Sequence, residues 1–424
     1  MEMPPHTSTE ADPGAIAVRI SEHVAALCAV GMDRHPGTDR NRWAVDYAVD
    51  AMLELGLEVE LLEFEVPEWR RSDAMVSIGD LEVRAQPGPF SAPLDAVGRL
   101  VVACCEEELA GVRVGGAVLL LHGSIAESQL TPRAYPWYAN PEHAAILDTL
   151  DRLEPLAVIA ATGRNPALTA ALSPFPLIED PAFGTPSAYI SVEEGVVLLD
   201  HAGEPVSVRI DSGVVPSTGV QPVGRLAGTG EGRVIVGAHI DTKPDTPGAL
   251  DNAGGVATLL AVAELLRSER TRLRRSVEFV PFNGEDHPQA PGEVAYLRAR
   301  PHLSDVALMV NVDGAGFREG ASVVSRYATN SAVDAAFSEA LSQASNVVEG
   351  VQWPSSDHMI FVMRGIPAIA VTSQGFSKLW NEVAHTSADT PDLVDPSVLA
   401  DAARFIAGVL RALDQCGPRL PDDL

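Results

Sequence analysis

Lysine is nearly absent from this sequence of 424 residues. It occurs only at positions 243 and 378, so arginine supplies almost all of the positive charge. Lysine and arginine together number 30, against 58 aspartates and glutamates, which gives a formal net charge of -28. Nucleic acids and anionic membranes bind basic surfaces. The composition therefore argues against both as partners, and we expect most of the carboxylates on a solvated surface.

Cysteine and long apolar runs are also scarce. The four cysteines, at positions 28, 104, 105 and 416, are too few and too scattered for a disulfide framework or a cysteine-based zinc site. No uninterrupted run of 18 apolar residues is present. The first 20 residues hold acids and prolines where a secretory signal has a basic start and an apolar stretch. We expect a soluble, cytoplasmic protein in which the adjacent Cys104 and Cys105 are buried thiols.

The length of the chain and a change in its secondary-structure pattern indicate more than one domain. A chain of 424 residues is longer than a single hydrophobic core ordinarily supports, while an apolar content of 46% is enough for packed cores. Residues 75–210 contain short β-like runs between proline and glycine loops, with one helix at about 141–153. We expect a flexible tail of residues 1–13, an α/β domain made of residues 14–74 and 211–424, and an inserted mainly-β domain of residues 75–210.

Strands alternate with helices outside the expected insertion. Continuous apolar runs predict strands, and helical spacing predicts helices between them. The strands are expected at 276–282, 306–312 and 367–372, and the helices at about 15–30, 42–55, 290–299, 331–345 and 397–413. This alternation implies an α/β fold with a mostly parallel wound sheet flanked by helices. Such sheets bind ligands beyond the carboxyl ends of their strands.

The stretch of residues 232–255 combines a strand end, a loop and a helix start. Val234, Ile235 and Val236 predict a short buried strand that ends near His239. Asp241 lies two residues further on, close enough to fix the tautomer of that histidine. Asp251 follows His239 by twelve residues and precedes a helix predicted at 256–266. An aspartate at a helix start is often only an N-cap, so neither feature alone defines a metal site.

More acidic and imidazole groups fall at the ends of other predicted strands. Glu285 and Asp286 follow the strand at 276–282, Asp313 follows the strand at 306–312, and His385 follows the strand at 367–372. Each alone is explained by an acidic turn, an Asx-turn or a surface imidazole. Together they lie on one expected edge of the sheet. The sequence therefore predicts a metal site with the ligands His239, Asp251, Asp286, Asp313 and His385.

The ordered series of motifs resembles peptidase family M28, a family of zinc aminopeptidases. The blocks are HxD at 239–241, DNAGG at 251–255, the acidic pair at 285–286, Asp-Gly at 313–314, SDH at 356–358, GIP at 365–367 and HT at 385–386. The resemblance covers about residues 230–415. The expected insertion is similar to a protease-associated (PA) domain, because a run at 182–191 resembles the end of that domain.

The resemblance implies two zinc ions bridged by Asp251. The other implied ligands form two pairs, His239 with Asp313 and Asp286 with His385. Imidazole and carboxylate ligands suit Zn²⁺, with positions left open for water. The family also implies Glu285 as the general base and a cis peptide bond between Asp251 and Asn252.

Two positions depart from the pattern of the family. The acidic pair is Glu285–Asp286, where the family usually has two glutamates. Because aspartate is one methylene shorter, we expect altered geometry or a weaker metal site at Asp286. Ala384 stands where some relatives have a tyrosine that stabilises the carbonyl oxygen. Tyr327 and His358 are the remaining candidates for that role.

We expect a metalloaminopeptidase that hydrolyses an N-terminal peptide bond or a small dipeptide-like amide, with Glu285 and Asp241 in the catalytic machinery. A transferase similar to glutaminyl cyclases, with one zinc, is an alternative. A non-catalytic binding protein with a PA domain is another. The substrate would be a peptide or a small amide, and the sequence leaves open a homo-oligomer.

Overall fold

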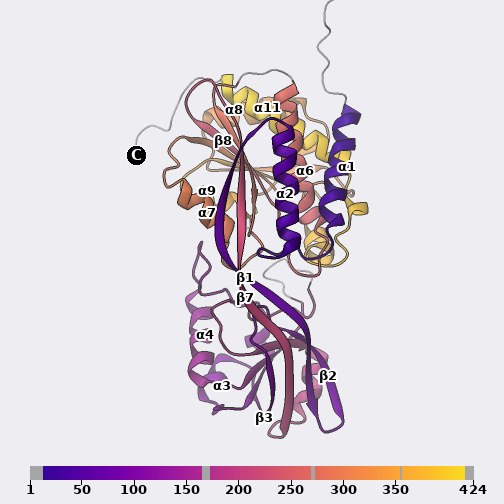
Figure 1. The fold of residues 1–424 in the computed structure, drawn as a ribbon, viewed down its shortest axis with the longest axis vertical. Helices are drawn as coiled ribbons and strands as arrows, with labels where there is room; N and C mark the ends of the chain where they lie inside the picture. The colour runs from indigo at the N-terminus through magenta and orange to yellow at the C-terminus, as the bar shows by residue number, and fades with distance from the viewer. Residues whose placement is uncertain (1–12, 165–171, 269–272, 354–355, 416–424) are drawn as a thin grey trace, which may run out of the picture. The chain divides into compact units, whose positions relative to one another are not determined.

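The computed structural model describes residues 13–164, 172–268, 273–353 and 356–415. These residues form two compact units (Figure 1). The first unit takes its described residues from Met1–Phe64, Gly219–His287 and Pro291–Leu424, and the second takes them from Glu65–Thr218 and Pro288–Ala290. The insertion expected at 75–210 falls inside the second unit. The tail expected at residues 1–13 lies almost wholly outside the described residues.

The first unit is built on a mixed sheet whose centre is parallel. Its strand order is β7–β9–β8–β10–β13–β11–β12. The bounds are Pro205–Leu226 for β7, Ser276–Phe282 for β9, Arg233–His239 for β8, Val306–Val312 for β10, Ala368–Ser373 for β13, Ser322–Tyr327 for β11 and Val347–Glu349 for β12. The pairs β9–β8, β8–β10 and β10–β13 are parallel, whereas β7 and β11 pair antiparallel with their neighbours β9 and β13. The α/β fold expected from the sequence is confirmed.

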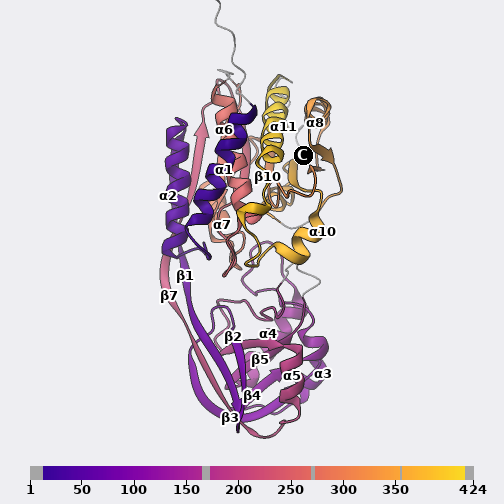
Figure 2. The same cartoon turned by 90° about the vertical axis from the view of Figure 1, so that its right-hand side faces the viewer.

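Helices cover both faces of this sheet, which explains the continuous apolar runs of its central strands. All seven residues of β9 are buried, as expected for a strand covered on both faces. Figures 1 and 2 show the longer helices on one side of the sheet, and Figure 1 shows α7 and α9 on the other. The bounds are Pro13–Ala29 for α1, Asp39–Glu54 for α2, Gly254–Ser268 for α6, Ser331–Gln343 for α8, Pro396–Gln415 for α11, Pro291–Ala299 for α7 and His358–Val362 for α9.

Helix α6 lies at the centre of the longer helices and packs against both α1 and α11. The span Ala249–Arg267, which contains most of α6, is long and apolar enough to cross a membrane, but 94% of it is buried inside the protein. Leu259, Val262 and Leu266, the residues whose spacing predicted the helix, are all at most 1% exposed. Core helices of water-soluble proteins pass the same test of length and composition, so we read α6 as the core of this unit.

The strands of the second unit pair in the order β1–β2–β6–β5–β4–β3–β7, and β7 also pairs with β9 of the first unit. The bounds are Glu58–Ile78 for β1, Leu81–Pro87 for β2, Ser187–Ser191 for β6, Ala157–Thr162 for β5, Val118–Leu121 for β4 and Leu94–Ala103 for β3. Strands β1 and β7 extend through both units. The predicted helix at 141–153 is confirmed as α4 (Pro141–Leu153), but α3 (Glu106–Gly111) and α5 (Val192–Leu199) were not predicted.

Cys104 and Cys105 follow the end of β3 in the second unit. The sequence predicted buried thiols within a strand, and this prediction is wrong, because both residues are partly exposed. The chain leaves the sheet at Ala103 and turns into α3, so the two side chains lie outside the core.

Candidate metal centre

The parallel strands of the first unit end along one edge, and the predicted ligands follow those ends. His239 is the last residue of β8, Asp286 lies in the loop after β9, and Asp313 directly follows β10. Asp251 lies between β8 and α6, in a segment whose φ and ψ are not helical, and His385 follows two short helical segments, Phe376–Lys378 and Leu379–Val383, that come after β13. The topology of a parallel sheet therefore brings residues from five chain segments to one place.

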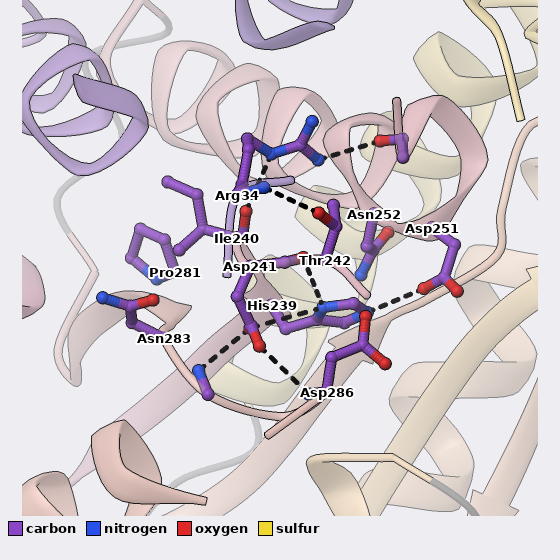
Figure 3. A network of polar contacts seen from close by, with 12 residues as sticks. Arg34, His239, Ile240, Asp241, Thr242, Asp251, Asn252, Pro281, Asn283 and Asp286 are labelled. Atoms are coloured by element: carbon purple, nitrogen blue, oxygen red, sulfur yellow. Dashed lines mark hydrogen bonds and ion pairs between the residues drawn. The ribbon is translucent and has the colours of Figure 1, made fainter. Parts of the chain in front are cut away.

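The Asp251 carboxylate lies between the two histidines. Its Oδ1 is 2.9 Å from His239 Nε2, and its Oδ2 is 3.1 Å from His385 Nε2. Figure 3 shows His239 and Asp251 facing each other, with Asp286 beside them. Each oxygen of one carboxylate thus meets a different imidazole. This is the geometry required of a residue that bridges two cations.

The remaining two aspartates lie beside different histidines. Asp313 Oδ1 is 3.5 Å from His239 Nε2, and Asp286 Oδ1 is 3.2 Å from His385 Nε2. A ring nitrogen of His239 and one carboxylate oxygen each of Asp251 and Asp286 lie within 4.8 Å of one another. The structure brings all five predicted ligands together, in the two pairs that the resemblance implied. The side chain of Asp286, although shorter than that of glutamate, reaches the cluster.

The cluster has more negative charge than its histidines can balance. Among the described residues, Asp251 Oδ2, Asp286 Oδ2 and Asp313 Oδ1 are buried oxygens that accept no hydrogen bond. Burial alone would lower the pKa of His385, but Asp286 and Asp251 raise it to about 10. Buried charges persist only when they are paired or coordinate a metal. Aspartate oxygens and imidazole nitrogens are zinc ligands, so the donor set fits divalent zinc.

Asp241 supports the loop that carries the acidic pair. Its Oδ1 accepts a hydrogen bond from the Gly284 amide at 2.9 Å, and its Oδ2 accepts one from the Asp286 amide at 3.1 Å. His239 Nδ1 lies 3.2 Å from the Asp241 carbonyl oxygen and 3.6 Å from the carboxylate. The sequence suggested that the carboxylate fixes the tautomer of His239. In the structure the carbonyl oxygen is the nearer partner of the imidazole, and the carboxylate mainly holds the loop.

Glu285 lies beside the cluster without belonging to either pair. Burial raises the pKa of its carboxyl group well above the ordinary value, and the negative charges of Asp286, Asp313 and Asp251 raise it further, against the opposing effect of His239. A carboxyl group in such surroundings accepts a proton more readily than an exposed glutamate. This property suits a general base.

The segment around Asp251 is held by residues that the sequence did not single out. Asp389 accepts hydrogen bonds from the amides of Leu250 and Asp251, at 2.7 and 3.0 Å. Asn252 donates to the Val312 carbonyl at 2.8 Å. The peptide bond between Asp251 and Asn252 is cis, as expected. The one signal for Asp389 in the sequence is its position four residues after His385.

Arg34 is a second buried support that the sequence did not indicate. Its guanidinium donates to the carbonyl oxygens of Ile240 and Gly248, at 3.1 and 2.9 Å, as part of the network in Figure 3. Its backbone amide donates to Thr242 Oγ1 at 2.9 Å. Arg34 thus fixes both ends of the loop between His239 and Asp251. It lies between α1 and α2, and nothing in the sequence marks it.

A pair of buried carboxyl groups, Glu293 and Asp357, was also not predicted. The two side chains belong to α7 and to the residue before α9, and they are 1% and 0% exposed. Their four oxygens accept no hydrogen bond from N–H or O–H donors in the described part of the chain. Burial raises the pKa of Glu293 to about 8, and the two carboxyl groups are within hydrogen-bonding reach of each other. Two such groups can bond only if one holds a proton.

The two candidates for stabilising the carbonyl oxygen are engaged elsewhere. The Tyr327 hydroxyl donates to the Trp353 carbonyl and accepts from the Trp353 amide, both at 2.7 Å. His358 Nε2 lies 3.2 Å from the same carbonyl oxygen. Both side chains therefore position the backbone of Trp353. The structure assigns neither of them to a substrate.

Sequence comparison relates the first unit to known peptidases. Residues 222–410 match Peptidase family M28. A probable lipoprotein aminopeptidase, LpqL, of Mycobacterium tuberculosis is 24% identical over 294 residues, which cover 66% of this chain and 54% of that protein. A putative endoplasmic reticulum metallopeptidase of Caenorhabditis elegans is 30% identical over 94 residues, 22% of this chain and 10% of that protein. The chain thus spans about half or less of the length of these two relatives.

Solved structures show the same fold along most of the chain. An aminopeptidase from Aneurinibacillus sp. strain AM-1 has a TM-score of 0.72 and 20% identity, with 93% of this chain and 92% of that chain covered. A zinc aminopeptidase from Bacillus subtilis has a TM-score of 0.71 and 19% identity, with 93% and 94% covered. At this identity the likeness establishes the fold. The family match, over residues 222–410, covers a little less than half of the chain and relates its first unit to peptidase family M28.

Proposed function

We propose that this protein is a zinc-dependent aminopeptidase that hydrolyses an N-terminal peptide bond or a small dipeptide-like amide. The observation that carries the proposal is the Asp251 carboxylate, which has one oxygen at each of two histidines. The family match and the two aminopeptidase neighbours support the reaction class.

The five clustered side chains would hold two zinc ions. Asp251 would bridge them, and the remaining ligands would be the pair His239 and Asp313 and the pair Asp286 and His385. When bound, the ions supply Lewis acidity toward water and toward the scissile carbonyl. The three aspartate oxygens that accept no hydrogen bond in the described residues favour this ligand set, because each can coordinate a cation.

Glu285 would act as the general base. It would accept a proton from the attacking water as the C–O bond forms, and then transfer that proton to the nitrogen of the leaving amine as the C–N bond breaks. The raised pKa of its carboxyl group suits both transfers. Asp241 would keep the loop of Glu285 in place through the Gly284 and Asp286 amides.

A one-zinc enzyme similar to glutaminyl cyclases is the less suitable alternative. His239 and Asp313 lie together on the far side of Asp251 from His385, and a single ion would leave that pair without a cation. A non-catalytic binding protein would not need to keep all five donors and a free glutamate beside them.

Substitution of Glu285 separates catalysis from metal binding. Glu285→Gln removes the base and no ligand, so turnover of aminoacyl and N-acyl amides should fall by about 100-fold or more while the zinc content stays at two ions per chain. Asp251→Ala should lose both zinc and turnover. Glu339→Gln, a change at an exposed residue of α8, is the matched control. Full turnover in Glu285→Gln would refute the assignment of the base.

A further inference from the structure

A second cluster of possible metal ligands lies in the second unit, at the carboxyl ends of two parallel strands. Cys104 and Cys105 follow β3, and His122 follows β4. In the paired strands Ala103 lies opposite Leu121, and the His122 amide donates to the Ala103 carbonyl at 3.1 Å. The residues that follow the two strands are therefore neighbours, on the edge of a parallel sheet where ligands commonly bind.

Both thiols of this cluster lie close to the same carboxylate. Successive side chains of a strand point to opposite faces, but here the strand has ended at Ala103, and Cys105 is the N-cap residue of α3. The sulfur atoms of Cys104 and Cys105 and a carboxylate oxygen of Glu108 lie within 4.8 Å of one another. All three side chains are at least partly exposed, so an ion from solution can reach them.

Cys104, which would bind the same ion as Glu108, also holds the Glu108 carboxylate in place. The Cys104 amide donates to Glu108 Oε2 at 2.9 Å. The Cys104 thiol also bonds to this carboxylate, which raises the pKa of Cys104 to about 11. His122 is near enough that its charge would help to lower the pKa of Glu108, after the larger effect of the Cys104 amide. A cation bound by the Cys104 sulfur and the Glu108 carboxylate would replace the thiol proton that now lies between them.

We propose that Cys104, Cys105 and Glu108 form a second metal site, which binds a thiophilic divalent cation of the Zn²⁺ and Cd²⁺ class, with His122 at the neighbouring strand end. Thiolate sulfur selects such ions over Mg²⁺ and Ca²⁺. The centre formed by His239 and the aspartates offers only nitrogen and oxygen, so the two sites differ in ligand chemistry. This proposal does not depend on the proposed peptidase activity.

Because only this site has sulfur ligands, metal binding to it can be measured separately from binding to the centre formed by His239 and the aspartates. The full chain, zinc-loaded and reduced, is titrated with Cd²⁺, and sulfur-to-cadmium charge-transfer absorption is followed in the ultraviolet. Because only thiolate ligands give this band, the nitrogen and oxygen centre is silent. We expect a band that saturates with one bound Cd²⁺ and is lost in the Cys104→Ser/Cys105→Ser double variant. Glu108→Gln should weaken Cd²⁺ binding by at least about tenfold, a loss typical even of residues that only support a metal ligand.

Cys28 provides the matched control. It is a partly buried thiol in the first unit, where burial raises its pKa to about 11. Cys28→Ser should keep the whole band. Absence of the band in the unmodified protein, or its persistence in the double variant, would overturn the proposal.

A measurement on the unmodified chain covers the case in which the double variant fails to fold. Cd²⁺ should protect Cys104 and Cys105 from a thiol-specific disulfide reagent, and mass mapping of the labelled peptides reports each cysteine separately. Equal labelling of both residues with and without Cd²⁺ would refute the site.

Discussion

Asp241 shows how one buried side chain can control a site without touching a substrate. Its two oxygens accept the amides of Gly284 and Asp286, and its carbonyl oxygen lies near His239 Nδ1. A carboxylate can accept at both oxygens, whereas the amide of asparagine has one acceptor and one donor group. Replacement by asparagine would therefore bring a donor against a donor on one side of the loop.

We predict that Asp241→Asn weakens metal binding by about 10- to 100-fold, the range found for supports of metal ligands. The ion held by Asp286 should be lost first, because Asp241 holds the Asp286 amide. Isothermal titration of the chelator-treated protein with Zn²⁺ measures this effect. Asp50→Asn, at an exposed residue of α2, is the control. Unchanged affinity at both sites would mean that the loop does not need Asp241.

Glu293 and Asp357 form a different kind of polar pair, which needs a proton. The pKa of Glu293 is raised by burial to about 8 in the folded chain, against about 4.3 when unfolded. Between these values the folded state holds a proton that the unfolded state has released. The contribution of Glu293 to stability should therefore be full at pH values below the unfolded pKa and be lost as the pH rises toward 8, by up to about 1.4 kcal/mol per pH unit.

We predict that Glu293→Gln removes the part of the pH dependence that Glu293 contributes, while burial still raises the pKa of Asp357. Glutamine keeps the size of the side chain and offers a permanent N–H donor to Asp357. The free energy of unfolding of the chelator-treated chain, measured between pH 5 and pH 8, should decline more steeply for the unmodified protein than for the variant. Glu339→Gln should follow the unmodified protein. Parallel curves for Glu293→Gln and the unmodified chain would show that the pair holds no such proton.

At the scale of elements, buried apolar runs determined the strands that position the centre. Strands β9 and β10 have the bounds that the sequence predicted, Ser276–Phe282 and Val306–Val312. Strands β7, β11 and β12 were not predicted. Residues of β7 alternate between buried and exposed over much of its 22-residue length, and β11 (SVVSRY) carries serine and arginine. Their strand character depends on pairing with neighbours, which a local pattern does not contain.

The packing of α6 gives a prediction at this scale. Leu259 is fully buried in the core that joins α6 to the sheet and to α11. Leu259→Ala should lower the free energy of unfolding of the first unit by about 2–5 kcal/mol, because the transfer energy is lost and a cavity remains. Urea denaturation monitored by circular dichroism measures the loss. Val18→Ala on α1, where the side chain is 57% exposed, should change it by less than about 0.5 kcal/mol.

At the scale of the whole molecule, the metal centre joins segments that are far apart in sequence. Its ligands extend from His239 to His385, and they carry negative charges that repel one another without cations. Zinc that binds only the folded chain should stabilise it by about 2.7 kcal/mol at a free concentration 100 times the dissociation constant. Removal by a chelator should lower the melting temperature, and Zn²⁺ should restore it. Asp251→Ala should show almost no response, and a full response in that variant would contradict the ligand set.

The sequence alone predicted the five side chains that the structure brings together, because each follows a strand end or precedes a helix start and the ordered series of motifs resembles a known family. It also determined the α/β class, and its composition argued against basic binding surfaces. The cytoplasmic location and the PA-like character of the insertion stay predictions.

Only the tertiary structure decided which groups hold those residues in place. Arg34, Asp389 and the pair of Glu293 and Asp357 act through contacts with segments distant in sequence, and a buried polar group looks in sequence like an exposed one. Cys104 and Cys105 illustrate the same limit, because their exposure follows from where β3 leaves the sheet. Local patterns record propensity and burial along one element, whereas hydrogen bonds and electrostatic partners depend on how separate elements meet.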